Sequence, residues 1–219
     1  MLEKVRSMRS EFTIPGKDKR SEQSSLVVDL GLKNKVYVFQ QMEGVTESFI
    51  YSVLPMLPEE RRRKVMHYRQ FADRRNCVIS YLMLKIGLQE CFQIVDFTLG
   101  YGENEKPYLA EYPDVYFNIS HCSCGCAVAV ADSPIGVDIQ DIRPFSWEIA
   151  RRVCSKQELE VLGRSSDRDW EFTRIWAMKE SYVKMTGQGI RCNLSGINTL
   201  SRKSIQVSDV SNGVIAVCF

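Results

Sequence analysis

The chain of 219 residues is 44% hydrophobic and 26% charged, and its formal net charge is +2. Such a composition is typical of a soluble globular protein with one large domain or two small ones. No apolar window approaches the length of a membrane span, so we expect no membrane as a partner. The nearly balanced charge argues against a nucleic acid as a partner, although it permits local basic patches.

The first 26 residues are rich in Ser, Lys, Arg and Glu. They contain no apolar core of the kind that a secretory signal has, and we expect a flexible N-terminal extension over residues 1–26. The chain has eight cysteines. Without a secretory signal, these are expected to be reduced thiols of a cytoplasmic protein.

Strands and helices follow one another without a regular βαβ order. Alternating or short apolar runs predict strands at residues 35–42, 94–100, 115–120, 126–132, about 135–140, 204–210 and 213–219. Helical periodicity predicts one long helix or two helices over 57–92, and further helices at about 146–153 and 155–162. For the last helix, Ser165, Ser166 and Asp167 are the candidate N-caps, and the two glycines of TGQG (186–189) end it. This mixture predicts an α+β fold.

Two helix starts are marked by their residue types. Pro58, Glu59 and Glu60 suit a first turn, because proline loses no helical hydrogen bond there and acidic side chains face the positive end of the helix dipole. Ser155 and Glu158 have the spacing of a capping box, in which each side chain accepts a hydrogen bond from the backbone of the other.

A lysine stands on the apolar side of the last long helix. A helical projection of residues 172–184 has one broad apolar arc, which consists of Phe172, Ile175, Trp176, Met178, Tyr182 and Val183. Lys179 falls near the centre of this arc and Glu180 at its edge. A lysine in such a place must extend to solvent or meet an anion. The alternative for Glu180 and Lys184, an exposed ion pair one turn apart, leaves Lys179 unexplained.

The strand around residue 138 carries polar side chains on one face. The alternation of a strand puts Gly136, Asp138 and Gln140 on that face. A carboxylate and an amide oxygen suit a hard cation such as Mg²⁺, and Glu180 would complete a set of three oxygens. The alternative is a strand end that turns polar where it meets solvent, and the short segment VDIQ taken alone favours this alternative.

Three cysteines, Cys122, Cys124 and Cys126, stand at every second position. We interpret this spacing as a strand with small residues on one packed face. A zinc site is the alternative, but the chain has only two histidines and no C-x-x-C pair. We therefore expect the three cysteines to be structural.

Five segments in order resemble the blocks of a known family. They are ENEKPYL, FNISHC, SPIGVDIQ, CSKQELEVL and WAMKESYVK, and they lie within residues 57–190. In these segments the chain resembles the 4′-phosphopantetheinyl transferases, most of all the type that activates surfactin synthetase. One such block is weak evidence, whereas five in the same order are very unlikely to match by chance.

The resemblance implies a fold, a reaction and a cofactor. The fold would be a pseudo-dimer of two similar halves, residues 27–132 and 133–219, with the active site in the cleft between them. The reaction would move 4′-phosphopantetheine from coenzyme A to a serine of an acyl or peptidyl carrier protein and release adenosine 3′,5′-bisphosphate. Mg²⁺ would be the cofactor, coenzyme A the co-substrate, and the enzyme a monomer.

The same resemblance gives roles to three residues. Asp138 and Glu180 would bind Mg²⁺, and the strand face adds Gln140 as a third candidate ligand. Glu180, or a water on the metal, would take the proton of the carrier's serine. Lys184 would stabilise or protonate the leaving phosphate. Many members of this type have an acidic residue where this chain has Gln140, so the chain departs from the family pattern at this position.

The residues expected to contact coenzyme A are Arg63, Arg75, Lys106, Ser120, His121, Lys179 and Lys184. By resemblance, Arg63 and Arg75 would bind its 3′-phosphate, for which the guanidinium fork is suited. Without the resemblance, a lone histidine is more often structural, Lys106 is a solvated loop lysine, and the basic run of residues 61–75 is a solvated face.

Two other functions are considered. The first is a non-catalytic protein that binds coenzyme A or a nucleotide on the same fold, which the presence of Asp138, Glu180 and Lys184 disfavours. The second is a different Mg²⁺-dependent phosphotransferase, but the chain has no G-x-x-x-x-G-K-[ST] phosphate loop. Carriers of fatty-acid, polyketide and peptide synthesis all present similar serine-bearing helices, so all three classes are candidate partners.

Overall fold

The computed structural model describes residues 25–29, 33–102, 106–189 and 192–219. The strands are β1 (Ser25–Asp29), β2 (Lys35–Phe39), β3 (Leu99–Tyr101), β4 (Pro107–Leu109), β5 (Tyr116–His121), β6 (Cys126–Ala131), β7 (Gly136–Asp141), β8 (Ile205–Val210) and β9 (Gly213–Cys218). The α-helices are α2 (Glu47–Val53), α3 (Glu59–His67), α4 (Phe71–Phe92), α5 (Trp147–Val153), α6 (Lys156–Arg164) and α7 (Arg168–Thr186). The expected N-terminal extension lies outside the described residues, except for residues 25 and 26 in β1.

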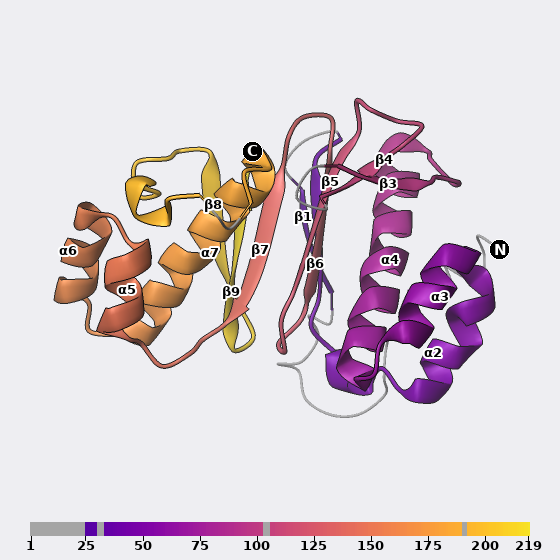
Figure 1. Cartoon of the computed structure of the whole chain (residues 1–219), viewed down its shortest axis with the longest axis horizontal. Helices are drawn as coiled ribbons and strands as arrows, with labels where there is room; N and C mark the ends of the chain where they lie inside the picture. Colours follow the sequence, from indigo (N-terminus) through magenta and orange to yellow (C-terminus); the bar gives the residue numbers. More distant parts are fainter. Residues whose placement is uncertain (1–24, 30–32, 103–105, 190–191) are drawn as a thin grey trace.

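Helices and sheets form four layers (Figure 1). Helices α2, α3 and α4 lie on one face of a four-stranded sheet with the order β1-β2-β6-β5. Helix α7 lies on the outer face of a three-stranded sheet with the order β7-β9-β8, and α5 and α6 lie beyond it. Neighbouring strands in both sheets are antiparallel. The mixture of helices and sheets agrees with the expected α+β class.

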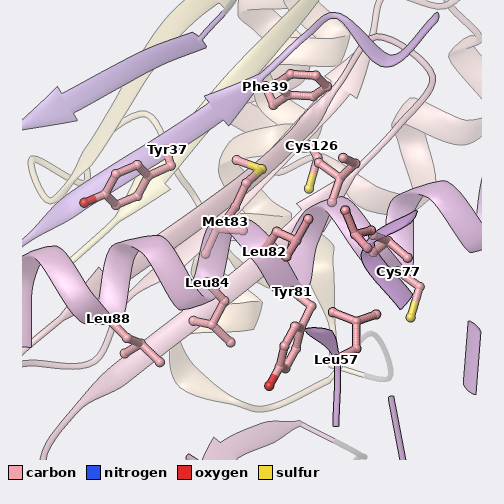
Figure 2. Close-up of a cluster of buried hydrophobic side chains, with 14 of the residues drawn as sticks. Tyr37, Phe39, Leu57, Cys77, Tyr81, Leu82, Met83, Leu84, Leu88 and Cys126 are labelled. Carbon is pink, nitrogen blue, oxygen red and sulfur yellow. The ribbon is translucent and has the colours of Figure 1, made fainter. Parts of the chain in front are cut away.

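The two sheets pack face to face through short and branched side chains. The buried members of this core are Val36, Val38, Ala127, Ala129, Ala131, Ile135, Val137, Ile139, Ile215 and Val217. Because side chains alternate along a strand, the other residues of β2 and β6 face α4. Figure 2 shows that second core, a buried cluster to which Tyr37 and Phe39 of β2 and Leu82, Met83 and Leu84 of α4 belong. Each such buried side chain contributes about 1.5–3 kcal/mol.

The two sheets have the same order of connection. In the first part of the chain, β2 is followed by helices that end with α4, and the hairpin β5–β6 then returns β6 to the side of β2. In the second part, β7 is followed by α5, α6 and α7, and the hairpin β8–β9 returns β9 to the side of β7. The orders β2-β6-β5 and β7-β9-β8 are therefore equivalent, with β1 and the small hairpin β3–β4 as additions to the first part.

Several local predictions are confirmed. Ser155 and Glu158 form the capping box at the start of α6. Asp167 caps α7, and Gly187 ends it in the left-handed conformation. The segment 57–92 forms two helices, because the backbone between them is extended at Tyr68. Within the described residues, no helix has the length and apolarity that a membrane crossing requires.

Three strand predictions are wrong in extent. The strand expected at 35–42 ends at Phe39, and Met42–Gly44 form a short 3-10 helix. Most of the strand expected at 94–100 is loop, and only Leu99–Tyr101 forms β3, because α4 continues to Phe92 and ends at Gln93 in the left-handed conformation. Cys122 and Cys124 lie in the turn between β5 and β6 rather than on a strand face. The regular spacing of the cysteines therefore continues across a hairpin, which strand periodicity does not reveal.

Candidate active site

Strand β7 and helix α7 approach each other backbone to backbone at Gly136. A Cβ atom at this position would lie 1.9 Å from the carbonyl oxygen of Ser181 and 2.6 Å from the amide nitrogen of Met185. Only glycine fits such an approach, because any side chain would push the helix away from the strand. The contact brings Glu180 and Lys184, one turn apart on α7, beside Asp138 on β7.

Asp138 is the centre of the hydrogen-bond network and has 1% exposure. Its Oδ1 accepts hydrogen bonds from the Ser120 hydroxyl at 2.8 Å and the Lys184 ammonium at 2.5 Å. Its Oδ2 accepts one from the Gln140 amide at 2.8 Å. Donors from β5, α7 and β7 thus compensate a buried charge that would be costly alone. Gln140 and Asp138 lie on the same strand face, as the alternation predicts.

Lys184 points from α7 toward β5 and β7. Its Nζ lies 2.9 Å from the Ser120 hydroxyl oxygen and 3.4 Å from the carbonyl oxygen of Val137, in addition to its contact with Asp138. The interpretation of residues 180 and 184 as an exposed helical pair is therefore wrong, because Lys184 pairs with Asp138 and Glu180 is buried.

Glu180 has an oxygen without a partner. The side chain is 6% exposed, and its Oε1 is buried with no hydrogen bond. Burial and then the negative charge of Asp138 raise the pKa of Glu180, while the positive charge of Lys184 opposes the rise. Two carboxylates share one lysine, which leaves an excess of negative charge. The two carboxylates are ligands of the kind that a hard divalent cation prefers, so they fit Mg²⁺. Gln140 presents its amide nitrogen to Asp138, so its oxygen would have to turn toward the ion to act as a third ligand.

A cleft of about 240 Å³ opens beside Glu180 and Lys184. It is lined by Lys106, Pro107, Asn118, Ile119, Glu180, Val183, Lys184, Gly187 and Gly189. These residues come from β4, β5 and α7 with the segment after it, so both parts of the chain contribute to the cleft. A second cleft of about 370 Å³ shares Lys106, Pro107 and Gly187 with the first, and its walls include several tyrosines.

Lys106 lines both clefts and is held by the end of α7. Its Nζ donates to the carbonyl oxygens of Lys184 at 2.6 Å and Met185 at 3.2 Å. A cation at a helix C-terminus is favourable, because the last carbonyl groups carry a partial negative charge. Burial lowers the pKa of Lys106. The structure thus places Lys106 on the cleft wall, where its expected contact with coenzyme A stays a prediction.

His121 ends β5 next to Ser120 and meets α4. Its Nδ1 lies 3.3 Å from the side-chain nitrogen of Asn76. His121 is exposed at the end of β5, and desolvation by neighbouring groups and then the charge of Lys184 lower its pKa. Arg75 precedes Asn76, donates to the carbonyl oxygen of Met42 at 2.7 Å, and has a buried Nε without a partner. Sequence reasoning missed Asn76, because only the fold brings it to His121.

Arg63 has the surroundings of a solvated helix face. Its side chain is 79% exposed and forms an ion pair with Glu59, one turn earlier on α3. The exposed pair agrees with the interpretation of most of the basic run as a solvated face. The structure gives Arg63 no contact with His121 or Asn76 among the interactions of the described residues, and its role at a phosphate stays a prediction.

Lys179 does not face the cleft. It is fully buried, and its Nζ pairs with Glu158 at 2.8 Å and donates to the carbonyl oxygens of Leu194 and Ile197. Glu158, also fully buried, accepts further hydrogen bonds from Thr199. The expected contact between Lys179 and coenzyme A is therefore wrong, because its ammonium has three oxygen partners and no exposed surface. A buried carboxylate, not a ligand, explains the lysine on the apolar side of α7.

Comparison with known families agrees with this geometry. Residues 134–219 match the family model described as the 4′-phosphopantetheinyl transferase superfamily, and residues 45–134 match the one described as 4′-phosphopantetheinyl transferase, N-terminal. The chain belongs to the 4′-phosphopantetheinyl transferase family. The two matches meet just before β7. The second covers the sheet β7-β9-β8 and its helices, and the first covers α2, α3, α4, β5 and β6 but not β1 and β2.

Several relatives bear the family's name. The transferase psf-1 of Bacillus pumilus is 31% identical over 153 residues, which are 67% of this chain and 64% of that protein. The transferase Sfp of Bacillus subtilis (strain 168) is 28% identical over 178 residues, 80% of either chain. The transferase AcpT of Escherichia coli (strain K12) is 34% identical over 125 residues, 54% of this chain and 64% of that protein. This chain thus spans just under two thirds of psf-1 and four fifths of Sfp.

Proposed function

We propose that the protein transfers 4′-phosphopantetheine from coenzyme A to a serine of an acyl or peptidyl carrier protein. The serine hydroxyl attacks the phosphorus next to pantetheine, the bond to the bridging oxygen of the pyrophosphate breaks, and adenosine 3′,5′-bisphosphate leaves. The observation that carries this proposal is the unpaired, buried oxygen of Glu180 beside Asp138 and Lys184, at the wall of a cleft. Family membership supports the same reaction.

Asp138 and Glu180 would hold Mg²⁺, with the Gln140 amide oxygen as a third candidate ligand. The ion, when bound, neutralises charge on the pyrophosphate oxygens. Lys184 contacts Oδ1 of Asp138 at 2.5 Å, beside the carboxylates that would hold the ion. Its ammonium would stabilise or protonate the leaving phosphate. Without a cation, one lysine stands against two carboxylates and the net charge is negative; with Mg²⁺ and Lys184 together it would be positive.

Glu180 is the proposed base for the serine proton. A carboxylate on the cleft wall is a residue type that can take such a proton, and a water on the metal is the alternative base. The position of Glu180 on the cleft wall lets a carrier's serine approach it. The remaining contacts with coenzyme A are proposed for Ser120 and His121 at the phosphates, Arg63 and Arg75 at the 3′-phosphate, and Lys106 at the cleft wall.

The two parts of the chain are proposed to be the halves of a pseudo-dimer, residues 27–132 and 133–219. The equivalent strand orders of the two sheets support this division. The residues that line the cleft come from both parts, which supports an active site between the halves. We expect the enzyme to act as a monomer, because one chain supplies both walls.

The test is an incubation of the protein with coenzyme A, Mg²⁺ and apo-carriers from fatty-acid, polyketide and peptide synthesis, followed by mass spectrometry of each carrier. At least one carrier should gain the mass of one phosphopantetheine, and EDTA should prevent the gain. Asp138→Asn, which keeps the shape of the side chain, serves as the inactive control. If the protein binds coenzyme A but no carrier gains mass, it is a non-catalytic binding protein and the proposal is wrong.

A further inference from the structure

The turn between β5 and β6, residues 122–125, holds two cysteines with their sulfur atoms in contact. The Sγ atoms of Cys122 and Cys124 lie 3.2 Å apart, and both side chains are partly accessible. All eight cysteines lie in the described part of the chain and are free thiols, four of them buried. A disulfide bond is about 2.0 Å long, so the two sulfurs need to approach by only about 1 Å to form one.

The two thiols differ in reactivity. The hydrogen-bond contact with Cys124 lowers the pKa of Cys122. The same contact and burial raise the pKa of Cys124. Because the thiolate is the nucleophile in thiol–disulfide exchange, Cys122 is the residue that attacks first and Cys124 the one that resolves the mixed disulfide.

The turn is bound to the strand that carries Asp138. The backbone amides of Ser123 and Cys124 donate to the Asp141 carboxylate at 3.1 Å and 2.8 Å, and Asp141 ends β7. At its other end, the turn follows directly on His121, the last residue of β5. A change in the shape of this turn therefore acts on both strands that carry candidate site residues.

We propose that Cys122 and Cys124 are a reversible dithiol–disulfide site whose oxidation weakens the binding of coenzyme A. The second part of this proposal rests on the proposed function. Closing the disulfide draws the two sulfurs together and tightens the turn. The amides of Ser123 and Cys124 then shift from Asp141, and the end of β5 at His121 shifts with them.

The oxidant is a low-molecular-weight disulfide such as glutathione disulfide. The Cys122 thiolate attacks one sulfur of this disulfide, whose sulfur–sulfur bond breaks, and one glutathione thiolate leaves. The Cys124 thiolate then attacks Sγ of Cys122 and releases the second glutathione thiolate. The two cysteines lose two protons and two electrons, and glutathione disulfide becomes two glutathione thiols.

The first experiment equilibrates the whole protein at graded ratios of reduced to oxidised glutathione, blocks free thiols in acid, and maps cysteines by mass spectrometry. A disulfide between Cys122 and Cys124 should form and reverse with the ratio. Cys124→Ser should stop at a glutathione adduct on Cys122, because it lacks the resolving thiol. Cys192→Ser, at a partly accessible cysteine outside the turn, should leave the disulfide unchanged.

Two results would contradict the proposal of a dithiol–disulfide site. One is the absence of this disulfide at every glutathione ratio. The other is a bound soft metal ion that the untreated protein retains and the Cys124→Ser variant loses. The sulfur atoms of Cys122 and Cys124 and an oxygen of Asp141 lie within 4.8 Å of one another. With a metal bound, these three atoms would be its ligands rather than a dithiol site.

The second experiment measures the Kd of coenzyme A by calorimetry for the reduced and the oxidised protein. Oxidation should raise Kd about fivefold or more. In the double variant Cys122→Ser and Cys124→Ser, the same treatments should give equal Kd values. Equal values in the unaltered protein contradict the coupling to the site. If the disulfide forms but neither the reduced nor the oxidised protein binds coenzyme A, the proposed function is wrong, whereas the proposal of a dithiol site is still supported.

Discussion

Glu180 combines burial with an unpaired oxygen. Glu180→Gln keeps the shape of the side chain and removes the charge that burial and Asp138 disfavour. Loss of a general base costs about 10²- to 10⁴-fold in rate, so we expect kcat to fall by at least about 100-fold. The Tm in EDTA should not fall, because the replaced oxygen accepts no hydrogen bond. Initial rates and thermal denaturation measure both effects.

Lys184→Met is the contrasting variant. It should lose turnover and also lower the Tm, because Asp138 is buried and would keep no cationic partner among its contacts. If Glu180→Gln lowers the Tm as much as Lys184→Met does, Glu180 is a structural residue and its assignment as base is wrong.

The buried pair of Lys179 and Glu158 predicts a pH-dependent stability. Burial opposes the ionisation of Glu158, but hydrogen bonds from Lys179, Thr199 and the Ser155 amide outweigh it, so the pKa of Glu158 lies below its ordinary value. The folded state therefore binds this proton less tightly than the unfolded state. The pair's stabilisation is present above the ordinary pKa of about 4.5 and is lost as the pH falls through the folded pKa.

Glu158→Gln tests this dependence. Breaking a buried pair costs about 3–5 kcal/mol, so the variant should lose that much stability to urea at neutral pH. The difference from the unaltered protein should shrink as the pH falls below about 4.5. Glu148→Gln, which breaks the exposed pair with Arg152 on α5, should cost about 0.5 kcal/mol or less. A cost for Glu158→Gln that does not change with pH would contradict the ion pair as its cause.

At the scale of elements, the contact of α7 with β7 depends on Gly136. Gly136→Ala puts a Cβ atom against backbone atoms of Ser181 and Met185, which cannot rotate away. Overpacking of this kind costs about 1–3 kcal/mol and often more. We expect a marked fall in Tm and loss of turnover, because α7 carries Glu180 and Lys184 and must move away from Asp138.

Gly163→Ala in α6 is the matched control. A Cβ atom at this position would have no neighbour within 4 Å. Alanine is favoured over glycine inside a helix by about 0.5–1 kcal/mol, so this variant should be as stable as the unaltered protein or more stable. A Gly136→Ala variant that keeps both Tm and activity would show that the close approach of α7 to β7 is not required.

The sequence predicted the features that depend on neighbouring residues alone, such as helix ends and strand faces. The capping box at Ser155, the end of α7 at Gly187 and the shared face of Asp138 and Gln140 follow from spacing and residue type alone. The end of α4 did not follow, because Gln93 adopts the left-handed conformation without being a glycine. Helix α2 was also not predicted from the sequence.

Contacts between side chains that are far apart in the chain could not be predicted from the sequence. The helical projection showed that Lys179 needs an anion, but Glu158 had been explained by its role in the capping box. The structure gives Glu158 both roles, since one carboxylate accepts from the Ser155 amide and pairs with Lys179. Asn76 was missed for a similar reason, because its contact with His121 joins residues 45 positions apart.

For the whole molecule, the face-to-face packing of two sheets determines where the site forms. Ser120 and His121 come from the sheet of the first part, and Asp138 and Gln140 come from the sheet of the second part. The hydrogen bond between Ser120 and Asp138 crosses from one sheet to the other. Neither part alone brings these groups together, so the arrangement of the two parts is as important for function as the residues themselves.

Asp138 and Glu180, on two different elements, are proposed to hold one Mg²⁺ that promotes the binding of coenzyme A. Calorimetry of coenzyme A binding, with Mg²⁺ and with EDTA, tests this claim most directly in the unaltered protein and in Glu180→Gln. We predict that Mg²⁺ lowers the Kd of the unaltered protein about tenfold or more, within the usual range of coupling between two ligands, and that Glu180→Gln loses this effect while it keeps its Tm. Equal lowering of Kd by Mg²⁺ in both proteins would contradict the claim.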